Sequence, residues 1–177
     1  QDGQPERTRQ SLVVEASGYA GKQIRIYPGY PDQGLSGYGE VSLGYKFRGT
    51  RHWQTYFRYP QVFCSFLYGY FGNAQVLGSS YGLMPGILLE SRNNRRFPVD
   101  VKLGTGLSWC NRPYHAITNP DNIVIGSHLT NVTMVAVRYR KTLNSSLALM
   151  CGAAFVHFSN AHYQLPNVGL NTLTLSL

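Results

Sequence analysis

A histidine and a serine stand two residues apart near the C-terminal end of the chain, in the stretch "HFSNAHYQLPNVGLN" at residues 157–171. In serine ester hydrolases, a serine attacks the ester carbonyl, a histidine takes its proton, and a third side chain orients the imidazole ring. Ser159 and His157 have the first two side-chain types, and Asn171 is the candidate for the third. The stretch therefore predicts either an esterase site with these three catalytic residues or a polar loop without a catalytic role.

The three side chains can meet only if two neighbouring strands carry them. Segments 145–159 and 169–177 are predicted to be β-strands, in which alternate residues share a face. His157, Ser159 and Asn171 then lie on one otherwise apolar face, and a register that sets His157 opposite Asn171 brings these two residues to within about 5 Å. The same register pairs Phe155 with Leu173 and Ala153 with Leu175.

The whole chain reads as a series of such strands. We predict eight, at residues 10–20, 37–49, 61–72, 82–92, 97–110, 128–142, 145–159 and 169–177. Most are long enough to cross a bilayer at a tilt, and longer connections mostly alternate with tight turns such as "NNRR" at 93–96, the gap 50–60 being the exception. This pattern predicts an all-β fold: a single domain over residues 1–177, forming an eight-stranded antiparallel transmembrane β-barrel. A soluble lipocalin-like barrel is the alternative.

Individual side chains can be assigned to the two faces of this barrel. Glu40, Glu90, Asp100 and Lys102 are predicted to point into the lumen. Aromatic residues near strand ends are predicted to form interfacial belts, namely Tyr38, Tyr45, Phe47, Trp53, Tyr56, Phe57, Tyr59, Phe97, Trp109 and Tyr139. Basic residues at or beside the predicted periplasmic ends are expected either to meet inner-leaflet phosphates or to form a solvated surface, namely Lys46, Arg48, Arg51, Arg58, Arg92, Arg95, Arg96, Arg138, Arg140 and Lys141.

Composition argues against several other classes of protein. The formal net charge of +8 is spread along the chain rather than gathered with stacking aromatics, so nucleic acid is not an expected partner. The sequence contains no apolar run of the roughly 20 residues that a transmembrane helix needs. The three cysteines and five histidines lack the spacing of a disulfide framework or a metal site, so neither a metal nor a cofactor is expected. The polar start, "QDGQPERTRQ", fits a chain whose secretory signal has been removed.

The stretch "VHFSNAHYQLPNVGLN" resembles the signature hairpin of the outer-membrane lipid A 3-O-deacylases, the PagL family. The matching residues are His157, Ser159, Asn160, Pro166, Asn167 and Gly169. The resemblance implies a small barrel whose serine and histidine face outward into lipid, with Ser159 as nucleophile and His157 as base. It also implies roles in the oxyanion hole or in substrate binding for Asn160, Asn167 and Gly169.

Two residues depart from the family pattern. Asn171 stands where the family carries a glutamate as third triad member, and His162 stands where it usually carries a glycine. If Asn171 is not the third member, Asp121 or Asn167 is the next candidate. A Ser-His-Asn set is also similar to that of the outer-membrane phospholipase A class, although that class uses a larger barrel.

These observations predict an integral protein of the Gram-negative outer membrane. The expected activity is hydrolysis of an ester-linked acyl chain of lipid A (lipopolysaccharide), in contact with other outer-membrane lipids. The alternatives are a phospholipase with a Ser-His-Asn triad and a non-catalytic barrel with protein partners in an envelope complex.

Overall fold

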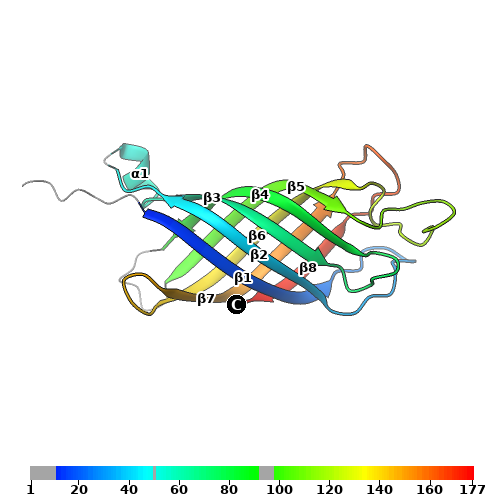
Figure 1. Cartoon of the computed structure of the whole chain (residues 1–177), viewed down its shortest axis with the longest axis horizontal. Helices are drawn as coiled ribbons and strands as arrows, with labels where there is room; N and C mark the ends of the chain where they lie inside the picture. Colours follow the sequence, from blue (N-terminus) through cyan, green and yellow to red (C-terminus); the bar gives the residue numbers. More distant parts are fainter. Residues whose placement is uncertain (1–10, 50, 92–97) are drawn as a thin grey trace, which may run out of the picture.

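The computed structural model describes residues 11–49, 51–91 and 98–177 (Figure 1). Within these residues the chain forms eight strands and one short helix. The strands are β1 (Ser11–Gln23), β2 (Ser36–Lys46), β3 (Gln61–Tyr70), β4 (Ser79–Glu90), β5 (Val99–Cys110), β6 (Leu129–Thr142), β7 (Ala148–Ser159) and β8 (Leu170–Ser176), and the helix is α1 (His52–Tyr56).

The strands close into a barrel in chain order, each antiparallel to the next, with β8 paired to β1. The prediction of an eight-stranded antiparallel barrel is confirmed, and every predicted strand overlaps an observed one. The irregular gap at 50–60 holds α1, while the predicted turn at 93–96 and Phe97 lie outside the described residues. No helix in the described part of the chain is long and apolar enough to cross a membrane.

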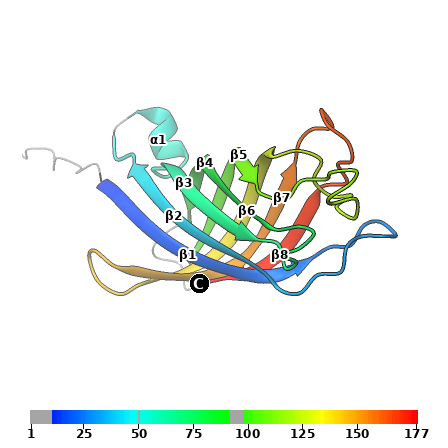
Figure 2. The ribbon, with the colours of Figure 1, turned by 45° about the vertical axis from the view of Figure 1, so that its right-hand side comes forward.

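The two ends of the barrel differ in their connections. One end carries the four connections 24–35, 71–78, 111–128 and 160–169, of which 111–128 is the longest, and we call it the loop end. The other end carries α1 and the short turn at 143–147, as Figures 1 and 2 show. Because β7 runs toward the loop end, its last residue, Ser159, lies there together with the first residues of β8.

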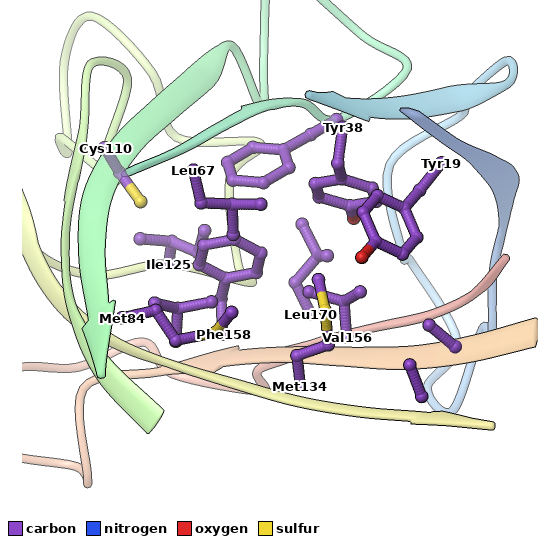
Figure 3. Close-up of a cluster of buried hydrophobic side chains, with 14 of the residues drawn as sticks. Tyr19, Tyr38, Leu67, Met84, Cys110, Ile125, Met134, Val156, Phe158 and Leu170 are labelled. Atoms are coloured by element: carbon purple, nitrogen blue, oxygen red, sulfur yellow. The ribbon is translucent and has the colours of Figure 1, made fainter. Parts of the chain in front are cut away.

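The loop half of the barrel is filled by apolar side chains. Phe158, Leu67, Met84 and Leu170 are almost completely buried, and Figure 3 shows them converging inside the barrel. The connection between β5 and β6 adds Val124 and Ile125, which are fully buried although they belong to no strand. This loop therefore packs into the mouth of the barrel and closes it.

Below this core, charged side chains fill the lumen. Glu15 accepts hydrogen bonds from Lys102 and Arg138, each at 2.6 Å, and Lys102 also lies 2.8 Å from Glu40. All four residues are buried, and the cluster contains two carboxylates and two cations. A second set with the same balance joins Lys46, Arg140, Glu90 and Asp100. The predicted lumen positions of Glu40, Glu90, Asp100 and Lys102 are thus confirmed, and the burial of each charge is offset by a partner.

Some of the predicted surface assignments are wrong. Tyr38 is only 4% exposed and its hydroxyl lies 2.6 Å from Thr172 Oγ1 inside the barrel, so it does not belong to an aromatic belt. Lys46, Arg138 and Arg140 bind carboxylates in the lumen and cannot meet lipid phosphates. All four occupy inward positions of their strands. The prediction rested on their closeness to a strand end, which does not indicate whether a side chain points inward or outward. Trp109 and Tyr139 are exposed on the outer surface, as expected.

The outer surface of the barrel is apolar along its strands. Residues that alternate with the buried ones are exposed and mostly aliphatic, for example Leu12, Val14, Leu107, Leu173 and Leu175. A barrel with a filled, charge-paired interior and an apolar exterior has its apolar face toward lipid.

The buried charge cluster yields the first prediction. Arg138→Leu removes one cation and leaves the carboxylates of Glu15 and Glu40 with Lys102 alone, so the interior carries an uncompensated charge. We expect the free energy of unfolding to fall by about 3–5 kcal/mol in urea titrations of detergent-folded protein. Lys141→Leu, on the exposed surface of the same strand, is the control and should have little effect. Equal losses in both variants would contradict the role assigned to the cluster.

Candidate active site

His157 and Asn171 face each other across β7 and β8 at the loop end. The observed register pairs His157 with Asn171, Phe155 with Leu173 and Ala153 with Leu175, so the predicted register is confirmed. The side chains meet as well, because His157 Nδ1 lies 2.8 Å from Asn171 Oδ1. Both are partly exposed on the outer surface, flanked by Phe155 and Leu173.

This contact defines the hydrogen-bonding state of the imidazole ring. An amide oxygen only accepts hydrogen bonds, so His157 Nδ1 must carry the hydrogen and donate it to Asn171 Oδ1. The neutral ring then has its lone pair on Nε2, the nitrogen that can accept a proton. In this arrangement Nε2 is the ring nitrogen of His157 that could accept a proton.

Ser159 lies on the same outward face as His157, two residues further along β7. Its Oγ accepts hydrogen bonds from Asn167 Nδ2 at 2.9 Å and from the backbone N–H of Ala161 at 3.3 Å. Within the described residues no hydrogen bond joins Ser159 to the His157 ring. The hydroxyl thus has two N–H donors beside it, and a base on the same face of the strand.

The polar groups of Asn160 bind residues of the loops and not Ser159. Its side chain is 3% exposed, and Nδ2 donates to Ser127 Oγ at 2.9 Å and to the Gln164 carbonyl at 2.8 Å. Its Oδ1 accepts the N–H of His162, and its own backbone N–H donates to Asn167 Oδ1. Asn160 therefore stabilises the 160–169 loop through these hydrogen bonds. The asparagine whose side chain contacts Ser159 is Asn167.

The tight turn after Ser159 uses an unusual backbone conformation. Ala161 and His162 have φ values of 54° and 63°, in the left-handed region that residues other than glycine rarely adopt. Gly169, at the end of the same loop, has φ 81°, and its N–H donates to the Val124 carbonyl. Gly169 therefore shapes the loop rather than offering a donor to Ser159. The conformation of His162 also explains why a glycine suits this position.

The 111–128 loop holds the 160–169 loop in place. A Cβ on Gly126 would lie 2.4 Å from the Pro166 carbonyl oxygen, so only glycine fits between the two loops. Tyr163 donates its hydroxyl to the Leu129 carbonyl at 2.9 Å. Tyr30, from the β1–β2 connection, donates to the Gly169 carbonyl, and burial raises the pKa of its hydroxyl, which keeps it a neutral donor. The loop around Ser159 is thus fixed by contacts from the 111–128 and 24–35 connections and from the first residue of β6.

Two residues of β6 border the site, and sequence reasoning did not single them out. Asn131 is directly opposite Ser159, and Thr133 is directly opposite His157. Both lie on the outward face of β6, where the following residues are Val135 and Val137. Two successive outward positions of β6 are polar although the rest of that face is apolar, and this pattern in the sequence could have identified them.

Other candidate residues lie apart from this group. Asp121 is exposed in the 111–128 loop, and its carboxylate makes no hydrogen bond to His157 in the described structure. No group of three or more His, Cys, Asp or Glu side chains that could hold a metal ion occurs among the described residues.

The hydrogen bonds of Asn160 yield the second prediction. Asn160→Ala removes the side-chain bonds that join β7 to the 111–128 and 160–169 loops, so amide hydrogen exchange in both loops should accelerate, by roughly ten- to a hundredfold, while the strands stay protected. Gln164→Ala is a matched control, because Asn160 binds the backbone carbonyl of Gln164 and not its exposed side chain. Unchanged exchange in Asn160→Ala would show that the loops are held by other contacts.

Comparisons with known proteins identify the fold and the family. A comparison with curated proteins found no match. A solved structure titled "Crystal structure of the outer membrane enzyme PagL" superposes with a TM-score of 0.63 at 17% identity, covering 93% of this chain and 97% of that chain. This likeness shows the same barrel fold. The family model for lipid A 3-O-deacylase (PagL) matches residues 37–177, which include β2 except its first residue, β3 to β8 and the whole candidate site, and the chain therefore belongs to the lipid A 3-O-deacylase (PagL) family.

Proposed function

We propose that this protein removes an ester-linked acyl chain from lipid A in the outer leaflet of the outer membrane, with Ser159 as nucleophile and His157 as general base. The observation that carries the proposal is the position of Ser159 and the Asn171-bound His157 on the lipid-facing surface at the loop end. In outer-membrane barrels the long loops face the outside, which sets these residues at the level of the outer-leaflet head groups. Membership of the family supports the same substrate.

The reaction can be written with the residues present. Ser159 Oγ attacks the ester carbonyl carbon while His157 Nε2 takes the hydroxyl proton, and the carbonyl oxygen becomes an oxyanion. Asn167 Nδ2 and the Ala161 N–H, which bind Ser159 Oγ in the resting protein, are the donors that we assign to that oxyanion. His157 then gives its proton to the departing sugar oxygen, and a water molecule hydrolyses the acyl-serine by the reverse sequence.

One rearrangement has to precede attack in this scheme. Ser159 Oγ must turn from Asn167 toward His157 Nε2, to within roughly 2.6–3.2 Å, for the proton to pass. A rotation about χ1 of a single serine is a fast side-chain motion. The hydrogen bond that His157 Nδ1 donates to Asn171 Oδ1 meanwhile keeps the ring in the required orientation.

Mass spectrometry of lipid A tests the proposal. Lipid A incubated with the wild-type barrel should lose the mass of one acyl chain, whereas Ser159→Ala should leave it intact, because only binding and oxyanion contacts remain without a nucleophile. Phospholipid in the same sample is the control substrate. Release of lysophospholipid from unchanged lipid A would instead indicate a phospholipase, and no change in either lipid would indicate a non-catalytic barrel.

The missing carboxylate gives a separate prediction. Asn171→Ala removes the acceptor that orients His157, so we expect deacylation to slow about 100-fold in a barrel that still shows heat-modifiable migration on gels. Asn171→Glu supplies a negative charge that stabilises the imidazolium, and its rate should equal or exceed that of the wild type. Full activity in Asn171→Ala would exclude this residue as the third member of the triad.

A further inference from the structure

The connection between β2 and β3, at the end of the barrel opposite the loop end, exposes several large aromatic side chains. It contains α1, and we call residues 47–49 and 51–60 the α1 connection. Trp53, Tyr56, Phe57 and Tyr59 are 41%, 71%, 52% and 37% exposed. Tryptophan and tyrosine are enriched where a protein crosses the interface between membrane and water, because one part of the side chain is apolar and another polar.

Specific hydrogen bonds hold the α1 connection in one conformation. Gln54 is buried, and its side-chain oxygen accepts the N–H of Arg51 at 3.3 Å. The Gln54 carbonyl accepts the N–H of Tyr59 at 2.6 Å. After α1, Arg58 and Tyr59 have φ values of 57° and 60°, a left-handed conformation that non-glycine residues keep only where their surroundings fix it. The exposed aromatic side chains therefore belong to an ordered unit.

A row of aromatic contacts joins the α1 connection to the outer surface of the barrel. Tyr45 is an outward residue of β2, and its ring centroid lies 5.3 Å from that of Phe47. The Phe47 centroid lies 5.1 Å from that of Trp53, and both contacts are edge-to-face. Figures 1 and 2 show α1 at the rim of the barrel, beside the ends of the strands. Since this end of an outer-membrane barrel faces the periplasm, α1 is level with the head groups of the periplasmic leaflet.

Three arginines lie among these aromatic residues, and no carboxylate neutralises them. Arg48, Arg51 and Arg58 are exposed, and the sequence from 47 to 60 contains no Asp or Glu. Within the described residues no ion pair involves any of the three. Arg140, by contrast, is paired with Glu90 inside the barrel. The guanidinium group is planar and binds phosphate oxygens through two parallel N–H bonds.

We propose that the α1 connection binds the head groups of acidic phospholipids in the periplasmic leaflet, with its arginines on the phosphates and its aromatic rings among the glycerol and upper acyl groups. A zwitterionic lipid serves the rings equally well, but its ammonium group offsets the phosphate charge, so the arginines favour a lipid of net negative charge. A lipid is favoured over a protein partner because the aromatic row continues onto the apolar outer surface of β2. This binding is independent of the esterase function of Ser159, because α1 lies at the opposite end of the barrel.

The fluorescence of Trp53 in lipid vesicles tests the proposal. The chain has two tryptophans, so Trp109→Phe leaves Trp53 as the only indole. The folded barrel is placed in mixed vesicles of phosphatidylcholine and phosphatidylglycerol, in which one lipid or the other carries brominated acyl chains that quench a nearby indole. We expect phosphatidylglycerol to associate with the Trp53 site about fivefold more tightly, the preference that one arginine provides. Replacing Arg48, Arg51 and Arg58 together by Gln should bring this ratio close to one.

A matched variant and a change of salt separate charge at α1 from charge elsewhere. Lys22→Gln, Arg25→Gln and Arg112→Gln together remove the same charge from exposed positions at the loop end and should leave the ratio unchanged. About 1 M salt should lower the ratio without any substitution at α1, because it screens exposed charges. Equal quenching by the two lipids, or a preference that survives the loss of the three arginines, would overturn the binding of acidic lipid. Absence of quenching by either lipid would mean that Trp53 faces water or a protein partner, which would overturn it as well.

Discussion

The two-residue period of strands in a closed barrel is the constraint on which the rest of the structure depends. Each strand is paired on both sides, so a residue that points outward does so together with its partner on the next strand. His157 and Asn171 are such partners, and Ser159 follows His157 on the same face. A shift of β8 by one residue would turn Asn171 into the lumen and the neighbouring Thr172 outward. The register therefore creates the candidate site as well as the barrel.

The side chains packed in the lumen stabilise that register, and the candidate site lies on the outer surface. Balanced clusters of carboxylates and cations fill one part of the lumen, and apolar side chains fill the part nearer the loops. On the outside, where water is scarce, the polar residues cluster around Ser159 and are hydrogen-bonded to one another. Such a surface would give a membrane lipid direct access to Ser159, the proposed nucleophile, without leaving the bilayer. It also explains how a barrel with a filled lumen can act on a lipid.

Periodicity was enough to predict the strands, the closed barrel and the pairing of His157 with Asn171, because each depends on local alternation. Periodicity was insufficient to predict the positions of side chains that depend on contacts between distant segments. Tyr38 and Arg138 were assigned to the surface from their closeness to strand ends, yet both are inward and have partners on other strands. The bonds from Asn160 to Ser127, and the facing of Ser159 by Asn131, follow from loop packing and from the β6–β7 register. The sequence motif of the β7–β8 hairpin contains no information about the loop packing or about the β6–β7 register.

A covalent probe tests most directly whether Ser159 is, as we propose, an activated nucleophile that faces lipid. An alkyl fluorophosphonate reacts with a serine made nucleophilic by a base: the Oγ–P bond forms, fluoride leaves and the base takes the proton. Peptide mass spectrometry of the folded wild-type barrel should find the adduct on Ser159, and the labelling rate should fall at least about 100-fold in His157→Ala. No adduct on Ser159 in the folded barrel, or equal labelling with and without His157, would contradict the account.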